Sequence, residues 1–137
     1  MKKIFIDSDI FLDVIENRLP FANDSSKVFD RVLTDDFSIF TSAICFANIY
    51  YIAGKNIGLK KAKEMIREFK SLFRIIPTSD QAIQLSLHSE FSDLEDAIQH
   101  FTAKENGMNL IITRNKKHYS KSEIPVLTPS EFLASLN

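Results

Sequence analysis

Carboxylates gather in two short stretches of this sequence, and close carboxylates can hold a divalent cation. Asp7 and Asp9 follow the apolar run at residues 4–6, and Asp93 and Asp96 lie in a second, helical stretch. Two carboxylates without a cation between them repel each other, so one of them must take up a proton or the fold loses stability. Mg²⁺ relieves this repulsion because it takes oxygen ligands, typically one or two carboxylates with water and phosphate. Such an ion can activate water and stabilise the leaving oxygen in phosphodiester cleavage.

Amides and hydroxyls follow two further apolar runs. Ser42 comes shortly after residues 37–40, and Asn48 follows about two helical turns later. Thr113 ends the run at 109–113, and Asn115 comes just after it. Ligands of open parallel sheets bind beyond the carboxyl ends of the strands, so we expect these side chains to lie near Asp7. The two asparagines would add neutral oxygens or orient a water molecule.

The elements that must position these residues alternate between strands and helices. Strands are expected at 2–6, 37–40, 73–76, 109–113 and 126–127. Helices are expected at 10–14, 25–33, 42–53 with Gly54 as the stop, 59–72, 79–89, 92–106 with Gly107 as the stop, and from 128 onward. Residues 92–95 and 128–131 each fit a capping box. This alternation predicts an α/β fold with a largely parallel sheet, and without a repeat or linker we expect one domain.

The second acidic group forms a stripe on its helix. Asp93, Asp96 and His100 stand at i, i+3 and i+7, so they share one face. The buried side is expected to consist of Leu94, Ala97, Ile98 and Phe101. For Asp93 a second interpretation stays open, because an acid in a first turn also complements the helix dipole.

Composition excludes several classes of protein. The 137 residues are 45% apolar and include 12 Phe, enough for the core of one domain, and the single cysteine excludes an internal disulfide. The apolar runs are too short for a membrane span or a signal peptide, so a cytoplasmic protein is expected. The net charge of −1 does not indicate a nucleic-acid binder. Bases nevertheless cluster at 55–74 and 114–121, either as an approach to an acidic site or as solvated helix faces.

Three motifs in this order resemble the PIN domain: Ile-Phe-Ile-Asp-Ser-Asp at 4–9, Asp-Leu-Glu-Asp-Ala-Ile at 93–98 and Leu-Ile-Ile-Thr-Arg-Asn at 110–115. The resemblance covers residues 1–137 as a single domain. It implies a three-layer α/β/α sandwich with a mainly parallel sheet of about five strands. It also implies a Mg²⁺- or Mn²⁺-dependent endoribonuclease, typically a VapC-like toxin of a toxin–antitoxin pair that forms a homodimer and is silenced by an antitoxin protein.

The family's four acidic positions can be assigned on this chain. The first is Asp7, and the third is Asp96 with Asp93 as an extra carboxylate one turn earlier. The second position, usually Glu, holds Asn48, and the fourth, usually Asp, holds Asn115. Two of the four expected acids are therefore amides. An amide is a weaker ligand of a cation, and Asp93 and Asp9 would partly compensate.

From this assignment we expect a metal held by Asp7, Asp96 and Asp93, with Asn48 and Asn115 completing the catalytic set. The residues expected near the RNA are Ser42, Thr113, Arg114 and Lys116. Ser42 is more readily interpreted as a helix cap, and Thr113 as a hydroxyl that bonds the Asp7 carboxylate. We expect single-stranded RNA to be the substrate because its bases are unstacked, and structured RNA is the other possibility. The apolar helix at 44–52 is the expected dimer surface.

Two alternatives remain at this level. The amides at 48 and 115 also fit a PIN-like module that has lost its metal and binds RNA or protein. Asp7-Ser8-Asp9 after a first strand also resembles the haloacid-dehalogenase-like phosphatases, with Asp7 as nucleophile and Asp9 as acid. That family places its final acids directly after a buried strand, and residues 89–93 do not form such a strand.

Overall fold

Five parallel strands form one central sheet in this computed structural model, which describes residues 2–34 and 36–136. The strands are β1 Lys2–Ile6, β2 Phe37–Ser42, β3 Phe73–Ile76, β4 Leu110–Ile112 and β5 Val126–Leu127. Their order across the sheet is β3-β2-β1-β4-β5, and every neighbouring pair is parallel. The chain leaves the central strand β1 in one direction and returns on its other side at β4. The carboxyl ends of β1 and β4 therefore meet where ligands of such sheets bind.

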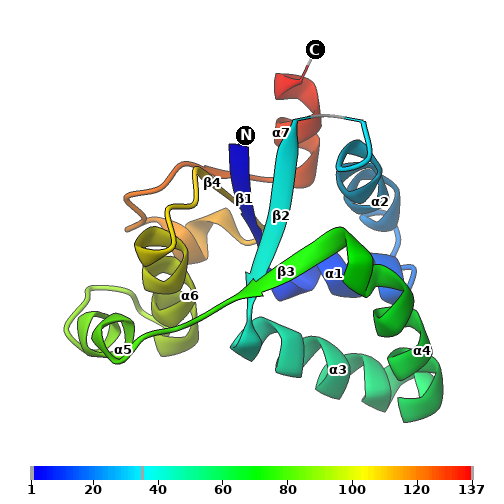
Figure 1. The fold of residues 1–137 in the computed structure, drawn as a ribbon, viewed down its shortest axis with the longest axis horizontal. Coiled ribbons are helices and arrows are strands. Elements are labelled where there is room, and N and C mark those ends of the chain that lie inside the picture. Colours follow the sequence, from blue (N-terminus) through cyan, green and yellow to red (C-terminus); the bar gives the residue numbers. More distant parts are fainter. Residues whose placement is uncertain (1, 35, 137) are drawn as a thin grey trace.

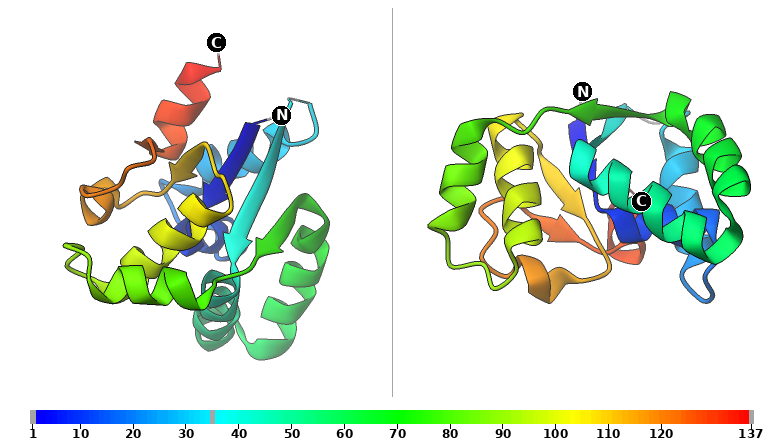
Figure 2. Two further views of the ribbon diagram at one scale, coloured as in Figure 1. Left: turned by 60° about the vertical axis from the view of Figure 1, so that its left-hand side comes forward. Right: turned by 90° about the horizontal axis from the view of Figure 1, so that it is seen from below.

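Helices cover both faces of this sheet (Figure 1, Figure 2). They are α1 Ser8–Ile15, α2 Ala22–Arg31, α3 Ala43–Ile57, α4 Leu59–Phe69, α5 Asp80–Leu87, α6 Leu94–Glu105 and α7 Pro129–Ser135, with short 3₁₀ turns η1 Lys70–Leu72 and η2 Lys116–Tyr119. None of the helices in the described residues is long and apolar enough to cross a membrane.

Side chains of β1 alternate between two hydrophobic cores. Ile4 and Ile6 pack into a core built with α1, α2, α3, α4 and α7, whereas Phe5 faces the other way, into a core with α6 and η2. Helix α5 lies on α6 and completes that second layer. The three-layer α/β/α sandwich expected from the sequence is confirmed.

Gly54 does not end its helix, contrary to the sequence prediction. Helix α3 continues to Ile57 and ends at Gly58, whose φ of 92° suits glycine. Gly54 is buried, and a Cβ there would meet Cδ2 of Leu59 at 2.6 Å. The buried glycine allows the Leu59 side chain at the start of α4 to lie against α3, and this contact is tertiary.

The prediction of a capping box at 92–95 is also wrong. Asp93, not Ser92, precedes the first residue of α6, and its Oδ1 accepts a hydrogen bond from the backbone N–H of Asp96 at 3.0 Å. The other predicted box is confirmed, with Thr128 and Glu131 bonded reciprocally at the start of α7. An aspartate caps a helix as well as a serine does. The shift by one residue places the Asp93 carboxylate at the first turn of α6.

Candidate active site

Asp7 lies at the carboxyl end of the central strand and is fixed by residues from three segments. Its Oδ1 accepts from the backbone N–H of Ser8 at 2.8 Å, which caps α1. Its Oδ2 accepts from the Thr113 hydroxyl and from the Tyr119 hydroxyl, both at 3.1 Å. Thr113 follows β4 and Tyr119 belongs to η2, so strand order brings partners more than a hundred residues away onto one carboxylate.

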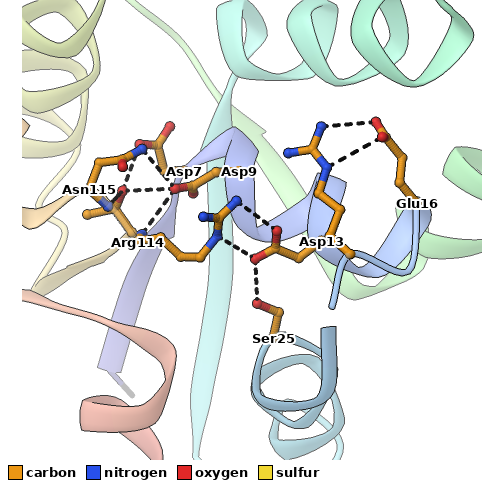
Figure 3. Close-up of polar contacts among 9 residues, drawn as sticks. Asp7, Asp9, Asp13, Glu16, Ser25, Arg114 and Asn115 are labelled. Carbon is orange, nitrogen blue, oxygen red and sulfur yellow. Dashed lines mark hydrogen bonds and ion pairs between the residues drawn. The ribbon is translucent and has the colours of Figure 1, made fainter. Parts of the chain in front are cut away.

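Asp9 lies beside Asp7 on the first turn of α1 (Figure 3). Its two carboxylate oxygens differ in their hydrogen-bond partners. Oδ2 accepts from the backbone N–H of Arg114 at 3.1 Å and from the Asn115 side chain at 3.3 Å. Oδ1 is buried and has no hydrogen-bond partner among the described residues. Burial and the charge of Asp7 raise the pKa of Asp9 to about 7, despite the opposing Arg114 bond.

The α6 acids lie within electrostatic range of Asp7. Burial, then the charges of Asp7 and Asp93, raise the pKa of Asp96 to about 6. His118 opposes this shift, with its Nδ1 3.5 Å from Oδ2 of Asp96. The structure therefore places Asp93 and Asp96 within electrostatic range of Asp7 and His118 beside Asp96, and a metal held by these three acids stays a prediction.

Both asparagines of the predicted site contact carboxylates. The Asn115 amide donates to Asp9, and the Asn48 Nδ2 donates to Oε1 of Glu95 at 2.6 Å. Burial, Asp93 and Asp7 raise the pKa of Glu95. Each amide holds a neighbouring acid in place through its N–H, which a carboxylate at the same position cannot do.

Arg114 is committed to a buried ion pair. Its Nε donates to Oδ2 of Asp13 at 2.8 Å and its second guanidinium nitrogen to Oδ1 at 3.0 Å (Figure 3). Its Cζ lies 4.0 Å from the centre of the Phe21 ring. Arg114 and Phe21 line a cavity of about 490 Å³ beside the start of α7. The Arg114 guanidinium is thus a structural partner of Asp13, whereas the prediction placed it on the RNA.

The other predicted substrate contacts have partners within the protein. Ser42 and Thr113 are fully buried. Ser42 caps α3 by accepting from the backbone N–H of Cys45 at 3.0 Å, and it donates to Gln99. Lys116 is exposed and pairs with Glu131 at 3.1 Å. Ser42 and Thr113 therefore position the site, and of the predicted set Lys116 lies open to solvent.

The face of α6 was partly mispredicted. His100 is 1% exposed, with its ring against Phe91 and Phe101, and its Nε2 accepts from the backbone N–H of Glu123 at 3.1 Å. Leu94, expected to be buried, is 49% exposed. The cause is that α5 and the segment around η2 pack against α6 in addition to the sheet. His100 consequently lies in the interior, and burial lowers its pKa.

Three site residues were missed by sequence reasoning. Asp13 is 0% exposed, and its spacing of four residues from Asp9 on one helix was the available signal. Glu95 lies inside a recognised motif but was assigned only to a cap. Tyr119 carried no signal, because its bond to Asp7 depends on the path of the chain after β4.

The chemistry of these donors fits a divalent cation. Burial first, and then the charges of Asp7 and Asp93, raise the pKa of Asp96, and a buried oxygen of Asp9 has no partner in the described part of the chain. No three acidic, histidine or cysteine side chains of the described residues form a ready-made metal cluster. Mg²⁺ needs only one or two carboxylates and keeps several waters. Asp7 and Asp96 are the residues that would hold it.

Comparison with known proteins agrees with this fold and site. A PIN domain family model matches residues 3–117. The chain is 30% identical to Ribonuclease VapC1 of Aquifex aeolicus (strain VF5) over 141 residues, which cover 99% of this chain and 96% of that protein.

Solved structures share the architecture. DNA-bound VapBC from Salmonella typhimurium has a TM-score of 0.71 and 17% identity, covering 94% of this chain and 99% of that chain. A toxin–antitoxin complex from Klebsiella pneumoniae has a TM-score of 0.64 and 25% identity, covering 92% and 97%. These matches replace the phosphatase interpretation of Asp7 and Asp9. The chain belongs to the PIN domain family, as a VapC-like member.

Proposed function

We propose that this chain is a Mg²⁺- or Mn²⁺-dependent endoribonuclease and the toxin of a toxin–antitoxin pair. A relative named as a VapC ribonuclease matches it from end to end, and solved toxin–antitoxin complexes share its fold. The observation that supports the metal dependence is the crowding of carboxylates at the end of β1: Asp7 and Asp9 lie 3.1 and 3.4 Å from the same Thr113 hydroxyl. Burial, followed by the charge of Asp7, also raises the pKa of the nearby Asp96 to about 6. A cation between these carboxylates removes the repulsion.

The proposed roles follow from the contacts. Asp7 and Asp96, with Asp93 beside them, are the residues that would hold the metal, which when bound would supply activation of water and charge stabilisation at the leaving oxygen of the phosphodiester. Thr113 and Tyr119 orient Asp7 through their hydroxyls. The Asn48 and Asn115 side chains hold Glu95 and Asp9 and leave amide oxygens for water or phosphate.

RNA is the proposed substrate, approached from the side of η2. Lys116 and Lys117 are exposed there, close in sequence to Asn115, and can contact the phosphate backbone without choosing a sequence. Because Arg114 is occupied by Asp13, we assign it to holding the β4 end in place and not to the RNA. Single-stranded RNA fits best, since unstacked bases can be contacted.

An antitoxin protein and a second copy of the chain are the proposed partners. Tyr51 on α3 is 64% exposed, which is consistent with a dimer surface on that helix. Light scattering at micromolar concentration tests the dimer, and a mass of 15.7 kDa, that of one chain, would exclude it.

The alternative, a PIN-like module without activity, is favoured by the amides at positions 48 and 115. Cleavage of a mixed single-stranded RNA by the wild type, Asp7→Asn and Asp96→Asn, with Mn²⁺ or with EDTA, separates the two. Cleavage that requires Mn²⁺ and falls by about a hundredfold or more in each variant supports the nuclease, since each variant loses a carboxylate that would hold the cation needed to stabilise transition-state charge. RNA binding without cleavage in Mn²⁺ would support the inactive module.

A further inference from the structure

The cavity of about 490 Å³ beside the start of α7 adjoins the candidate active site. Arg114 connects the two places, because its backbone N–H donates to Oδ2 of Asp9 at 3.1 Å and its side chain lines the cavity. Lys116 of η2 pairs with Glu131 of α7 at 3.1 Å, so the cavity also lies near the side from which RNA is proposed to approach. An RNA strand in the active site therefore has a neighbouring base within reach of this cavity.

Phe21 gives the cavity a flat aromatic wall. Its ring is 43% exposed, and Cζ of Arg114 lies 4.0 Å from the ring centre. Because two hydrogen bonds to Asp13 fix the Arg114 guanidinium, this group in turn holds the ring in place. Unpaired RNA bases stack on aromatic rings, and a ring that is already held loses little conformational freedom on binding. The wall is therefore suited to a planar ligand.

Asp24 gives the cavity a polar edge. It lies in the first turn of α2, where an acid complements the helix dipole. Its side chain is half-buried and has no hydrogen-bond or ion-pair partner among the described residues. The basic group of the cavity, Arg114, is already neutralised by Asp13. Asp24 therefore keeps two carboxylate oxygens that can only accept, so a ligand must bring donors to them.

Guanine fits this combination of wall and edge. Its Watson–Crick edge carries two adjacent donors, N1–H and N2–H, which match the two oxygens of a carboxylate. Uracil offers one donor on that edge, and adenine and cytosine each place an acceptor beside their donor. Proteins recognise unpaired RNA bases by stacking together with hydrogen bonds to this edge.

We propose that this cavity binds an unpaired guanine of the substrate RNA, which stacks on Phe21 and donates N1–H and N2–H to Asp24. The inference rests on the proposed ribonuclease function and adds a base preference to it. A basic side chain of a protein partner is the other ligand that a carboxylate attracts. Guanine is favoured because the wall is flat and because the cavity shares Arg114 with the site proposed for the phosphodiester.

The test is the affinity of the wild type for two labelled RNAs, measured by fluorescence anisotropy in EDTA so that no cleavage occurs. Both RNAs are short runs of uridine, one with a central guanosine and the other with inosine, which lacks the N2 amino group. We expect the guanosine RNA to bind about fivefold or more tightly, since a bidentate contact to the correct base discriminates by this much. Equal affinities would overturn the proposal, and no change in the protein is involved.

Asp24→Asn locates the preference on the protein. The amide loses one acceptor and turns an N–H toward the donors of guanine, so the two RNAs should bind alike. Asp30→Asn, a change of the same kind at an exposed acid of α2 that does not line this cavity, is the matched control and should keep the preference. A guanosine preference that survives in Asp24→Asn would contradict the assigned contact.

Phe21→Leu tests the stacking wall separately. The variant keeps an apolar side chain and loses the aromatic face, so its affinity for the guanosine RNA should fall by about fivefold or more. Wild-type affinity in Phe21→Leu would overturn the role of the ring.

The same titrations separate this inference from the function on which it depends. Equal binding of both RNAs overturns the guanine site and leaves RNA binding standing, whereas failure of both RNAs to bind overturns the RNA function together with the guanine site. Equal RNA affinities with binding of N-acetylargininamide to the wild type, but not to Asp24→Asn, would assign the cavity to a protein partner instead.

Discussion

Asp13 and Asp9 lie one turn apart on α1 and have opposite surroundings. Asp13 is 0% exposed, accepts two bonds from the Arg114 guanidinium and a third from the Ser25 hydroxyl at 3.0 Å. Asp9 has Asp7 as its charged neighbour, its pKa is raised to about 7, and one of its buried oxygens has no partner among the described residues. The first acid is neutralised by the protein. The second keeps a carboxylate oxygen without a partner among the described residues.

This difference separates structural acids from functional ones by their partners. A buried charge is tolerated when it is paired and hydrogen-bonded, and otherwise the fold carries a cost that a ligand can remove. Asp96 belongs with Asp9, since its pKa is also raised and its nearest base is a histidine at 3.5 Å. We therefore expect loss of charge to lower the stability of the fold at Asp13, and to leave it unchanged or raise it at Asp9 and Asp96.

The largest effect is expected for Asp13→Asn. This change leaves the Arg114 guanidinium, whose side chain is 23% exposed, without its anionic partner. Breaking a buried pair from one side costs about 3–5 kcal/mol, so the free energy of unfolding in urea should fall by roughly that amount. Asp9→Asn is the matched change one turn earlier, and at pH 8 it should leave stability unchanged or higher. Equal losses in both variants would remove the distinction between the two acids.

A smaller effect is expected for Ser25→Ala. The buried hydroxyl donates to Oδ2 of Asp13, and a hydrogen bond to a charged group contributes about 1.5–3 kcal/mol. The urea midpoint should fall while Mn²⁺ affinity stays the same, because the cation site does not include Asp13. Ser26→Ala, the neighbouring half-buried serine on α2, is the control. A change in Mn²⁺ affinity in Ser25→Ala would link the two acidic groups.

The smallest effect is a pH dependence of stability in EDTA. The pKa of Asp9 rises from its usual 3.8 to about 7 on folding, so the folded protein binds this proton more tightly than the unfolded chain. Stability is therefore gained as pH falls through about 7 and lost as pH rises through it, by at most about 1.4 kcal/mol per pH unit for one group. Urea unfolding between pH 8 and 7 measures the slope, because nearer pH 6.5 the unfolded chain protonates His100, whose pKa is lowered on folding, and this opposes the effect of Asp9.

Asp9→Asn provides the comparison for this slope. The variant cannot take up the proton, so its stability should vary less over the same range. An unchanged slope in Asp9→Asn would mean that Asp9 is not the group that binds the proton on folding.

Much of the fold was readable from the sequence because local signals and tertiary packing agree. The predictions are correct for the strands at 2–6 and 73–76 and for the glycine stop at 107. Apolar runs indicate these strands in the sequence itself, and Gly107, at φ 72°, suits a helix end without help from distant residues. Gly54 was mispredicted as a helix stop because a second glycine, Gly58, lies four residues later and takes the positive φ at which α3 ends. His100 was mispredicted because α6 is covered on more than the one side that its periodicity indicates.

The residues of the candidate site also divide into those that local sequence signals indicate and those that depend on tertiary packing. Asp7, Asp93 and Asp96 could be singled out from the sequence because acids at strand and helix ends have no use in a core. Tyr119 and the Asn48–Glu95 bond were not, since they depend on how distant segments pack. The ion pair of Arg114 was missed, and the residue was expected on the RNA, because its partner Asp13 is 101 residues away in the sequence.

The most direct test of the central claim is calorimetric titration of the folded protein with Mn²⁺. The wild type and Asp13→Asn, the latter at a temperature where it remains folded, should both bind the ion, whereas Asp7→Asn and Asp96→Asn should not. Binding should also release protons near pH 7, seen as a heat that varies with the ionisation enthalpy of the buffer, because the raised pKa values of Asp9 and Asp96 fall when the cation arrives. A folded wild type that shows no saturable heat at millimolar Mn²⁺ would contradict the account.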